Sequence, residues 1–198
     1  MEFCASADLR EHLAVLGIFS SATRAEFRRE IRSSWMPDGP PSRIVPRFVL
    51  RGVGASSSTI NESHVTGDIV FMEAPSSMDR ASGPLQTLLL WYHCAVTAWP
   101  NALLIGKADD DVWLHLPSVA MHAYRSIAAL QAYDKRSSAR LMYWGQMETY
   151  HWSEETHKPI GFGWHFRQGE RCRVQAKTRE GATRVVGPFH YAKGPLYF

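Results

Sequence analysis

The chain has 198 residues, of which 45% are hydrophobic and 21% are charged, and its formal net charge is +3 at pH 7. This length and composition predict one globular domain with a buried core. The small positive charge requires neither nucleic acid nor a membrane surface as a partner, and no apolar run approaches the ~20 residues that cross a bilayer.

The first predicted element is a buried strand over Leu13–Phe19, a continuous apolar run of strand length. A helix follows, and Thr23 and Glu26 have the spacing of a capping box at its start. The predicted buried face of this helix recurs every four residues and consists of Phe27, Ile31 and Trp35.

Three arginines follow the same spacing beside that apolar face: Arg24, Arg28 and Arg32. The ordinary interpretation of such a stripe is a solvated flank of the helix. On this interpretation the arginines contribute little to stability and bind nothing.

The next segments alternate between strand and helix patterns. Arg47–Gly52 and Asp68–Met72 are predicted strands, and Glu62–Thr66 is the predicted end of a short helix between them. A longer helix begins at Ser82–Pro84, with proline at its first position. Its predicted apolar face comprises Leu85, Leu88, Leu89, Tyr92, Val96 and Trp99. This alternation is typical of a mostly parallel sheet covered by helices.

Three consecutive carboxylates, Asp109, Asp110 and Asp111, follow the short apolar run Leu103–Ile105, which we predict to be a buried strand. Ligands of open α/β sheets bind at this end of the strands. Adjacent carboxylates repel one another unless a cation or hydrogen bonds hold them ionised. An extended backbone would place Asp109 and Asp111 on one face and Asp110 on the other, and such oxygen ligands suit Mg²⁺ or Mn²⁺. The alternative is an acidic surface turn or a helix N-terminus, where aspartate is common.

The C-terminal third is less regular. We expect a helix over Pro117–Tyr133, a strand over Arg140–Gly145, and irregular structure with short strands from Gln146 onward. The three cysteines, Cys4, Cys94 and Cys172, have no metal-ligand spacing, so buried free thiols are the default. A disulfide between Cys94 and Cys172 would require an oxidising compartment.

Five segments, in this order, resemble the β-1,3-galactosyltransferase and N-acetylglucosaminyltransferase family, glycosyltransferase family 31. They are Arg28–Trp35, Gly67–Val70, Lys107–Val112, Tyr143–Gly145 and Pro188–Tyr197. The resemblance implies an α/β fold of the GT-A type, a Rossmann-like sandwich with a mostly parallel central sheet that is incomplete at the C-terminus. It implies a single glycosyltransferase domain over residues 1–198. Residues from about 11 to 145 would bind the nucleotide sugar, and those from about 146 to 198 would begin the acceptor side.

The implied activity is an inverting hexosyl transfer in β-1,3 linkage, from UDP-galactose or UDP-N-acetylglucosamine to a glycan acceptor on a glycoprotein or glycolipid. The implied cofactor is Mn²⁺ or Mg²⁺. The implied location is the lumenal side of the Golgi membrane, with a membrane anchor expected in the full-length protein and absent here. The alternative is a catalytically inactive fragment or a module that binds nucleotide sugars or glycans.

By the same resemblance, individual residues acquire expected roles. The expected nucleotide-sugar contacts are Arg28, Arg32, Lys107, Asp109 and Asp110. The expected metal ligands are Asp109 and Asp111, and the expected acceptor-side residues are Trp144, Tyr191 and Gly194. The general base is expected beyond Phe198. The family carries a lysine in the helix before the acidic strand, and in this chain Gln86 or Thr87 stands near that position.

Overall fold

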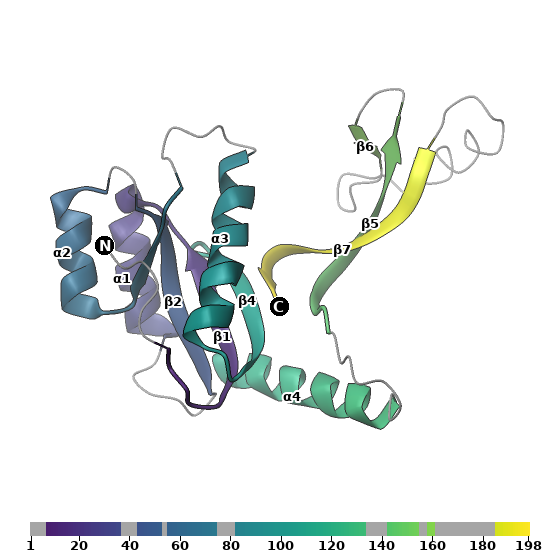
Figure 1. Cartoon of the computed structure of the whole chain (residues 1–198), viewed down its shortest axis with the longest axis horizontal. Coiled ribbons are helices and arrows are strands. Elements are labelled where there is room, and N and C mark those ends of the chain that lie inside the picture. The colour runs from purple at the N-terminus through teal and green to yellow at the C-terminus, as the bar shows by residue number, and fades with distance from the viewer. Residues whose placement is uncertain are drawn as a thin grey trace. The chain divides into compact units, whose positions relative to one another are not determined.

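The computed structural model describes residues 7–36, 43–52, 55–74, 82–133, 142–154, 158–160 and 185–198. The chain divides into two compact units (Figure 1). The first comprises residues 1–142 together with Phe198, and the second comprises residues 143–197. No helix among the described residues is long and apolar enough to cross a membrane.

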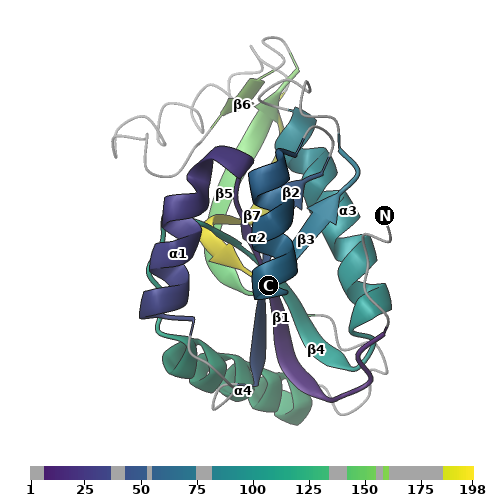
Figure 2. The same ribbon diagram turned by 90° about the vertical axis from the view of Figure 1, so that its left-hand side faces the viewer.

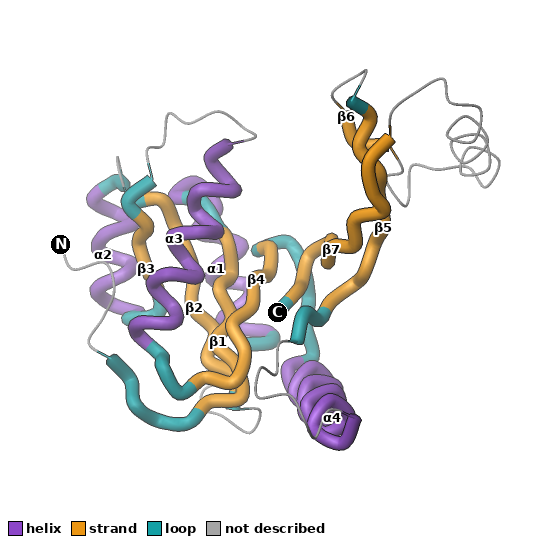
Figure 3. The backbone as a smooth tube through the Cα atoms, turned by 45° about the vertical axis from the view of Figure 1, so that its right-hand side comes forward, coloured by secondary structure: helices purple, strands orange, loops and turns teal. Residues whose placement is uncertain are grey.

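The first unit is built on parallel strands. They are β1 (His12–Phe19), β2 (Ile44–Arg51), β3 (Ile69–Met72) and β4 (Ala102–Asp109), in the spatial order β3-β2-β1-β4. Every pairing among them is parallel, and helices connect them (Figure 3). The predicted α/β class with a parallel sheet is therefore confirmed. Register places Phe19 beside both Val49 and Asp109, so the C-terminal ends of β1, β2 and β4 meet at one edge.

The helices of this unit are α1 (Ala25–Ser34), which follows a short 3₁₀ turn at Ala22–Arg24, then α2 (Ser57–Thr66), α3 (Ser82–Ala98) and α4 (Leu116–Tyr133). Helices α1 and α3 lie on opposite faces of the sheet (Figure 2). Adjacent residues of β2 point to opposite faces of the sheet. Phe48 contacts Arg32 of α1, whereas Val49 packs in the cluster beneath α3.

The contact between α3 and the sheet is unusually close at Gly17. A Cβ atom at this position would lie 2.5 Å from Cε2 of the fully buried Trp91. The Trp91 indole lies over β1 and donates a hydrogen bond of 3.0 Å to the carbonyl oxygen of Gly106. Glycine at position 17 is therefore required for this packing, and small residues at Ala95 and Ala98 continue it.

The predicted apolar face of α3 is wrong in part. Leu85, Leu89 and Val96 are exposed, whereas Thr87, Trp91 and Ala95 face the sheet. Leucine side chains carried the periodicity in the sequence. The close approach of α3 to Gly17 instead buries the face of the helix that carries the tryptophan and the small residues.

The start of α1 also differs from the expectation. The predicted capping box of Thr23 and Glu26 does not form, because the chain makes the 3₁₀ turn first and the N-cap position moves to Arg24, which makes no side-chain capping bond. Ile31 and Trp35 are buried as predicted, but Phe27 is exposed. The Phe27 ring instead packs against the Arg24 guanidinium, 4.3 Å from Cζ to the ring centroid.

The second unit is antiparallel. Strand β5 (Gly145–Ser153) pairs with β6 (Lys158–Ile160) and with β7 (Val185–Tyr197). The expected strand over Arg140–Gly145 is wrong in its described part, because the strand begins at Gly145. The expectation of irregular structure from Gln146 onward is also wrong where the structure describes it, since β7 has 13 residues.

Cys94 is almost fully buried on α3 and takes part in a disulfide. The other two cysteines lie outside the described residues, so the structure does not test the alternative of a pairing with Cys172. The default expectation of a free thiol at Cys94 is wrong. Disulfides persist mainly in oxidising compartments.

Candidate functional site

The acidic triplet lies at the C-terminal end of β4. Asp109 is the last residue of the strand, and Asp110 and Asp111 form the turn that follows. Their side chains differ in exposure: 43% for Asp109, 1% for Asp110 and 57% for Asp111. The buried carboxylate thus lies between two accessible ones, although the backbone is not extended through Asp110 and Asp111 as expected.

Each of the first two carboxylates has a cationic partner. The Lys107 ammonium pairs with Asp109, two residues away on the same strand. It also lies 5.8 Å from the centroid of the Phe19 ring on β1. Asp110 pairs with Arg24, which comes from the segment between β1 and α1. Ion pairs therefore hold Asp109 and Asp110 at the sheet edge, while Asp111 is more exposed.

Asp110 keeps one unused acceptor. Its Oδ2 atom is buried and has no hydrogen-bond partner among the described residues. Burying a carboxylate oxygen without a hydrogen-bond donor costs free energy, because no new hydrogen bond replaces the lost hydration. An orphaned oxygen at this position fits a site that is completed by a cation or by a ligand that donates hydrogen bonds.

The donor set suits Mg²⁺ or Mn²⁺ on chemical grounds, because it consists of carboxylate oxygens. Among the residues that the structure describes, no three His, Cys, Asp or Glu side chains converge as a ready-made metal cage. Mg²⁺ usually binds through one or two carboxylates together with substrate phosphates and water. Asp109 and Asp111 therefore fit an ion that arrives with a phosphorylated ligand better than one held by protein alone.

Arg28 and Arg32 are not on a solvated flank. Arg28 is completely buried and donates to both oxygens of Glu62 on α2, at 2.9 Å from Nε and 2.5 Å from Nη2. Arg32 donates to Glu62 at 2.8 Å and forms a two-point contact with Asp68, at 2.7 and 2.8 Å. The hydrogen bond from Arg28, aided by Arg32, holds the pKa of Glu62 below its ordinary value.

This arrangement joins α1, α2 and the start of β3 into one ionic cluster. Arg28 also donates to the backbone carbonyl of Ser21 at 2.5 Å and to Ser20 Oγ at 3.1 Å. It therefore fixes the segment that leads from β1 to Arg24. Both guanidinium groups have protein partners in the structure, and their expected contacts with a nucleotide sugar stay a prediction.

The expected acceptor-side residues all belong to the second unit. Trp144 is half-buried and directly precedes β5. Tyr191 lies on β7 opposite Glu148 of β5. Between Gln146, which pairs with Lys193, and Gly145, which pairs with Tyr197, the register shifts, so Gly194–Leu196 form an irregularity in β7. A glycine and a proline suit such a break, since proline has no ladder N–H to donate.

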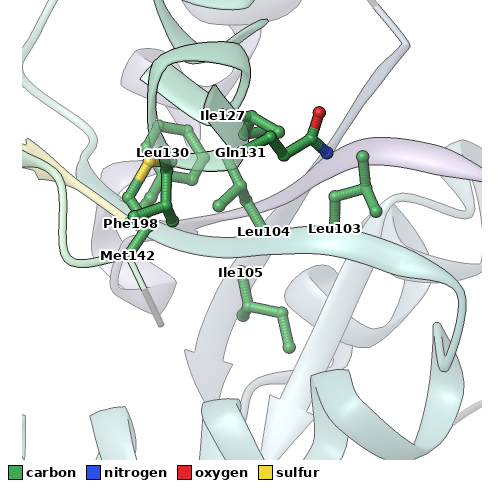
Figure 4. Close-up of a pocket in the computed structure, with 8 residues that line it drawn as sticks. All are labelled: Leu103, Leu104, Ile105, Ile127, Leu130, Gln131, Met142 and Phe198. Carbon is green, nitrogen blue, oxygen red and sulfur yellow. The ribbon is translucent and has the colours of Figure 1, made fainter. Parts of the chain in front are cut away.

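A separate pocket of about 390 Å³ lies in the first unit (Figure 4). Its lining is almost entirely apolar and consists of Leu103, Leu104, Ile105, Ile127, Leu130, Gln131, Met142 and Phe198. It lies along the N-terminal half of β4, whereas the acidic triplet lies at the other end of that strand. The pocket is thus distinct from the sheet-edge site. Among its eight lining residues, Gln131 alone has a polar side chain.

Arg24 is the site residue that sequence reasoning missed. Its spacing is the same as that of Arg28 and Arg32, and nothing in the linear pattern separates the three. The 3₁₀ turn removes Arg24 from the helical stripe and directs it to Asp110, 86 positions further along the chain. Only the parallel pairing of β1 with β4 brings the two residues together.

Comparison with known proteins assigns the chain to a family. The galactosyltransferase family model matches residues 26–198. The chain belongs to this family, and its parallel α/β unit is consistent with a Rossmann-like GT-A fold. The chain is also similar to a protein of Arabidopsis thaliana named "Probable beta-1,3-galactosyltransferase 1", with 27% identity over 125 residues. The aligned region covers 57% of this chain and 32% of the relative, so the chain spans about a third of that relative's length.

Proposed function

We propose that this protein is a glycosyltransferase that binds a UDP-sugar at the acidic sheet edge and transfers the hexose to a glycan acceptor in β-1,3 linkage. The observation that carries the proposal is the position of Asp109–Asp111 at the C-terminal end of β4 in a parallel sheet, with an orphaned carboxylate oxygen on Asp110. Family membership and the name of the plant relative support the same class of reaction.

In this proposal Asp109 and Asp111 would hold Mn²⁺ or Mg²⁺, and Lys107 and Asp110 would border the nucleotide sugar. When bound, the ion would neutralise charge on the departing diphosphate. Lys107 would contribute a preorganised positive charge to the same leaving group without a proton transfer. Arg28 and Arg32 would serve the site by holding α1 and the segment before it in place.

The acceptor is proposed to be a glycan on a glycoprotein or glycolipid, approached from the side of Trp144, Tyr191 and Gly194. The attacking hydroxyl must lose its proton to a general base. The donor is proposed to be UDP-galactose or UDP-N-acetylglucosamine. The proposed location is the lumenal side of the Golgi membrane, and the disulfide at Cys94 supports an oxidising compartment.

The proposal is tested by incubating the protein with each UDP-sugar and Mn²⁺, with and without galactose-terminated and N-acetylglucosamine-terminated acceptors, and measuring released UDP and new glycan product. We expect UDP release with one donor and loss of that release in Asp111→Asn. The matched control is Glu26→Gln, which removes an exposed carboxylate on α1. UDP-sugar binding without any transfer would instead support the alternative of an inactive binding module.

A further inference from the structure

Arg24 occupies a position between the nucleotide-facing edge of the sheet and the first helix. It is the N-cap of α1, where its side chain makes no capping bond. One guanidinium nitrogen, Nη1, pairs with the buried Asp110, and Nη2 lies 3.8 Å from Oδ2 of Asp111, beyond hydrogen-bond distance. The side chain remains 38% exposed, so Nη2 can reach a further acceptor in solvent.

We infer that Arg24 couples cation binding to nucleotide binding: it weakens the affinity of the acidic triplet for a divalent cation alone and strengthens binding of a diphosphate once that cation is present. The inference rests on the proposed function, because it assumes that the triplet is the nucleotide-diphosphate site. It assigns a specific role to a residue whose spacing alone indicated only a helix flank.

The charges around the triplet give the direction of both effects. Three aspartates carry three negative charges, and Arg24 and Lys107 together carry two positive charges, which leaves a net charge of −1. A divalent cation would change this local charge to +1, which attracts a diphosphate. Without the charge of Arg24 the values would be −2 and 0, so the cation would be attracted more strongly and the diphosphate less.

Arg24 is better placed for this role than Lys107. The Lys107 side chain is only 16% exposed and packs near the Phe19 ring, so its ammonium is confined beside Asp109. Arg24 instead presents a planar fork, of which one branch is held by Asp110 and the other is directed toward the more exposed Asp111. A guanidinium fixed at one branch suits phosphate recognition through the other.

The buried oxygen of Asp110 provides an independent indication that a ligand completes this site. Asp110 Oδ1 accepts from Arg24, while Oδ2 is buried without a partner among the described residues. The ion pair with Arg24 therefore satisfies one oxygen of the Asp110 carboxylate and leaves the other without a donor.

The test compares Arg24→Gln with the control Arg29→Gln. The control removes an equal charge from the exposed surface of α1, where Arg29 lies 4.0 Å from Glu26. Mn²⁺ alone is titrated by electron paramagnetic resonance, and UDP is titrated calorimetrically in saturating Mn²⁺. We expect Arg24→Gln to raise the Mn²⁺ affinity and to lower the UDP affinity, each by about two- to fivefold, as for a partly exposed charge pair. Arg29→Gln should change neither.

Arg24→Lys keeps the charge but not the fork. It should retain the original Mn²⁺ affinity and recover only part of the UDP affinity. Two affinities that change in the same direction, or that match those of Arg29→Gln, would overturn the inference. If the unaltered protein binds UDP no better with Mn²⁺ than without, the proposed function and the nucleotide half of the inference both fail. The Mn²⁺ titration of Arg24→Gln then decides the remaining half alone.

Discussion

Replacing Glu62 with glutamine should destabilise the protein severely, because this carboxylate balances a fully buried charge. Arg28 has no exposed side-chain surface, and two of its three nitrogens donate to Glu62. Removing one partner of a buried ion pair costs about 3–5 kcal/mol, since the other charge stays desolvated and unpaired. Whole domains are stable by only about 5–15 kcal/mol, so Glu62→Gln would lose a large share of that margin.

The assay is urea-induced unfolding followed by circular dichroism, with Glu26→Gln as the matched control. Glu26 and Arg29 are both highly exposed and 4.0 Å apart, so the control should change the free energy of unfolding by less than about 1 kcal/mol. The double variant Arg28→Met/Glu62→Leu should recover much of the stability that Glu62→Gln loses, because it leaves no isolated buried charge at Arg28. A loss below about 1 kcal/mol in Glu62→Gln would refute the claim that this ionic cluster holds α1 to α2.

The same cluster predicts a dependence of stability on pH. The pKa of Glu62 is lower in the folded protein than its ordinary value of 4.5, so the unfolded chain binds this proton first as the pH falls. The contribution of Glu62 is therefore complete above pH 4.5 and is lost progressively below it. Urea titrations at a series of pH values should show this loss, and Glu62→Gln should lack that part of the pH dependence.

Three further predictions concern local packing. Gly17→Ala should cost about 1–3 kcal/mol in urea unfolding, because the new Cβ would lie 2.5 Å from the Trp91 ring, and a neutral result would contradict the described contact. Ser56→Ala should cost about 0.5–2 kcal/mol, since Ser56 Oγ accepts from the Thr59 N–H at the start of α2, and Ser58→Ala is the control. A reducing agent should lower the melting temperature of the protein but not that of Cys94→Ser, and equal shifts in both would show that the disulfide at Cys94 does not stabilise the fold.

The parallel unit was largely predictable because its signals are local. Apolar runs such as Leu13–Phe19 and the proline near the start of α3 locate strands and helices without knowledge of their neighbours. The buried face of α3 was not predictable in the same way. It depends on Trp91 meeting Gly17, and that contact joins residues 74 positions apart in a register that only the folded sheet defines.

The position of the acidic triplet at the sheet edge was predictable from the sequence, whereas the partners of the three arginines were not. Asp109–Asp111 are adjacent in sequence and follow a strand, so their meeting at the sheet edge needs no tertiary information. The three arginines of the first helix have identical spacing but different surroundings, with Arg28 buried against Glu62, Arg32 against Asp68, and Arg24 paired with Asp110. Those partners lie on other elements, and helical periodicity cannot distinguish them.

The second unit was the least predictable part. Strand β7 contains glycine and proline residues that normally interrupt a strand, and two register shifts against β5 accommodate them. Its pairing with β5 joins segments about 40 residues apart. The local sequence therefore indicated irregular structure where long-range pairing produces a strand.

The most direct test of the proposed donor site is a calorimetric titration of the protein with UDP, in the presence and absence of Mn²⁺, for the unaltered chain, Asp109→Asn, Asp111→Asn and the control Glu26→Gln. We predict Mn²⁺-dependent binding that both triplet variants lose and the control keeps, with circular dichroism melts showing that every variant remains folded. Equal UDP affinity in Asp111→Asn and Glu26→Gln would contradict the assignment of the sheet edge as the nucleotide-sugar site.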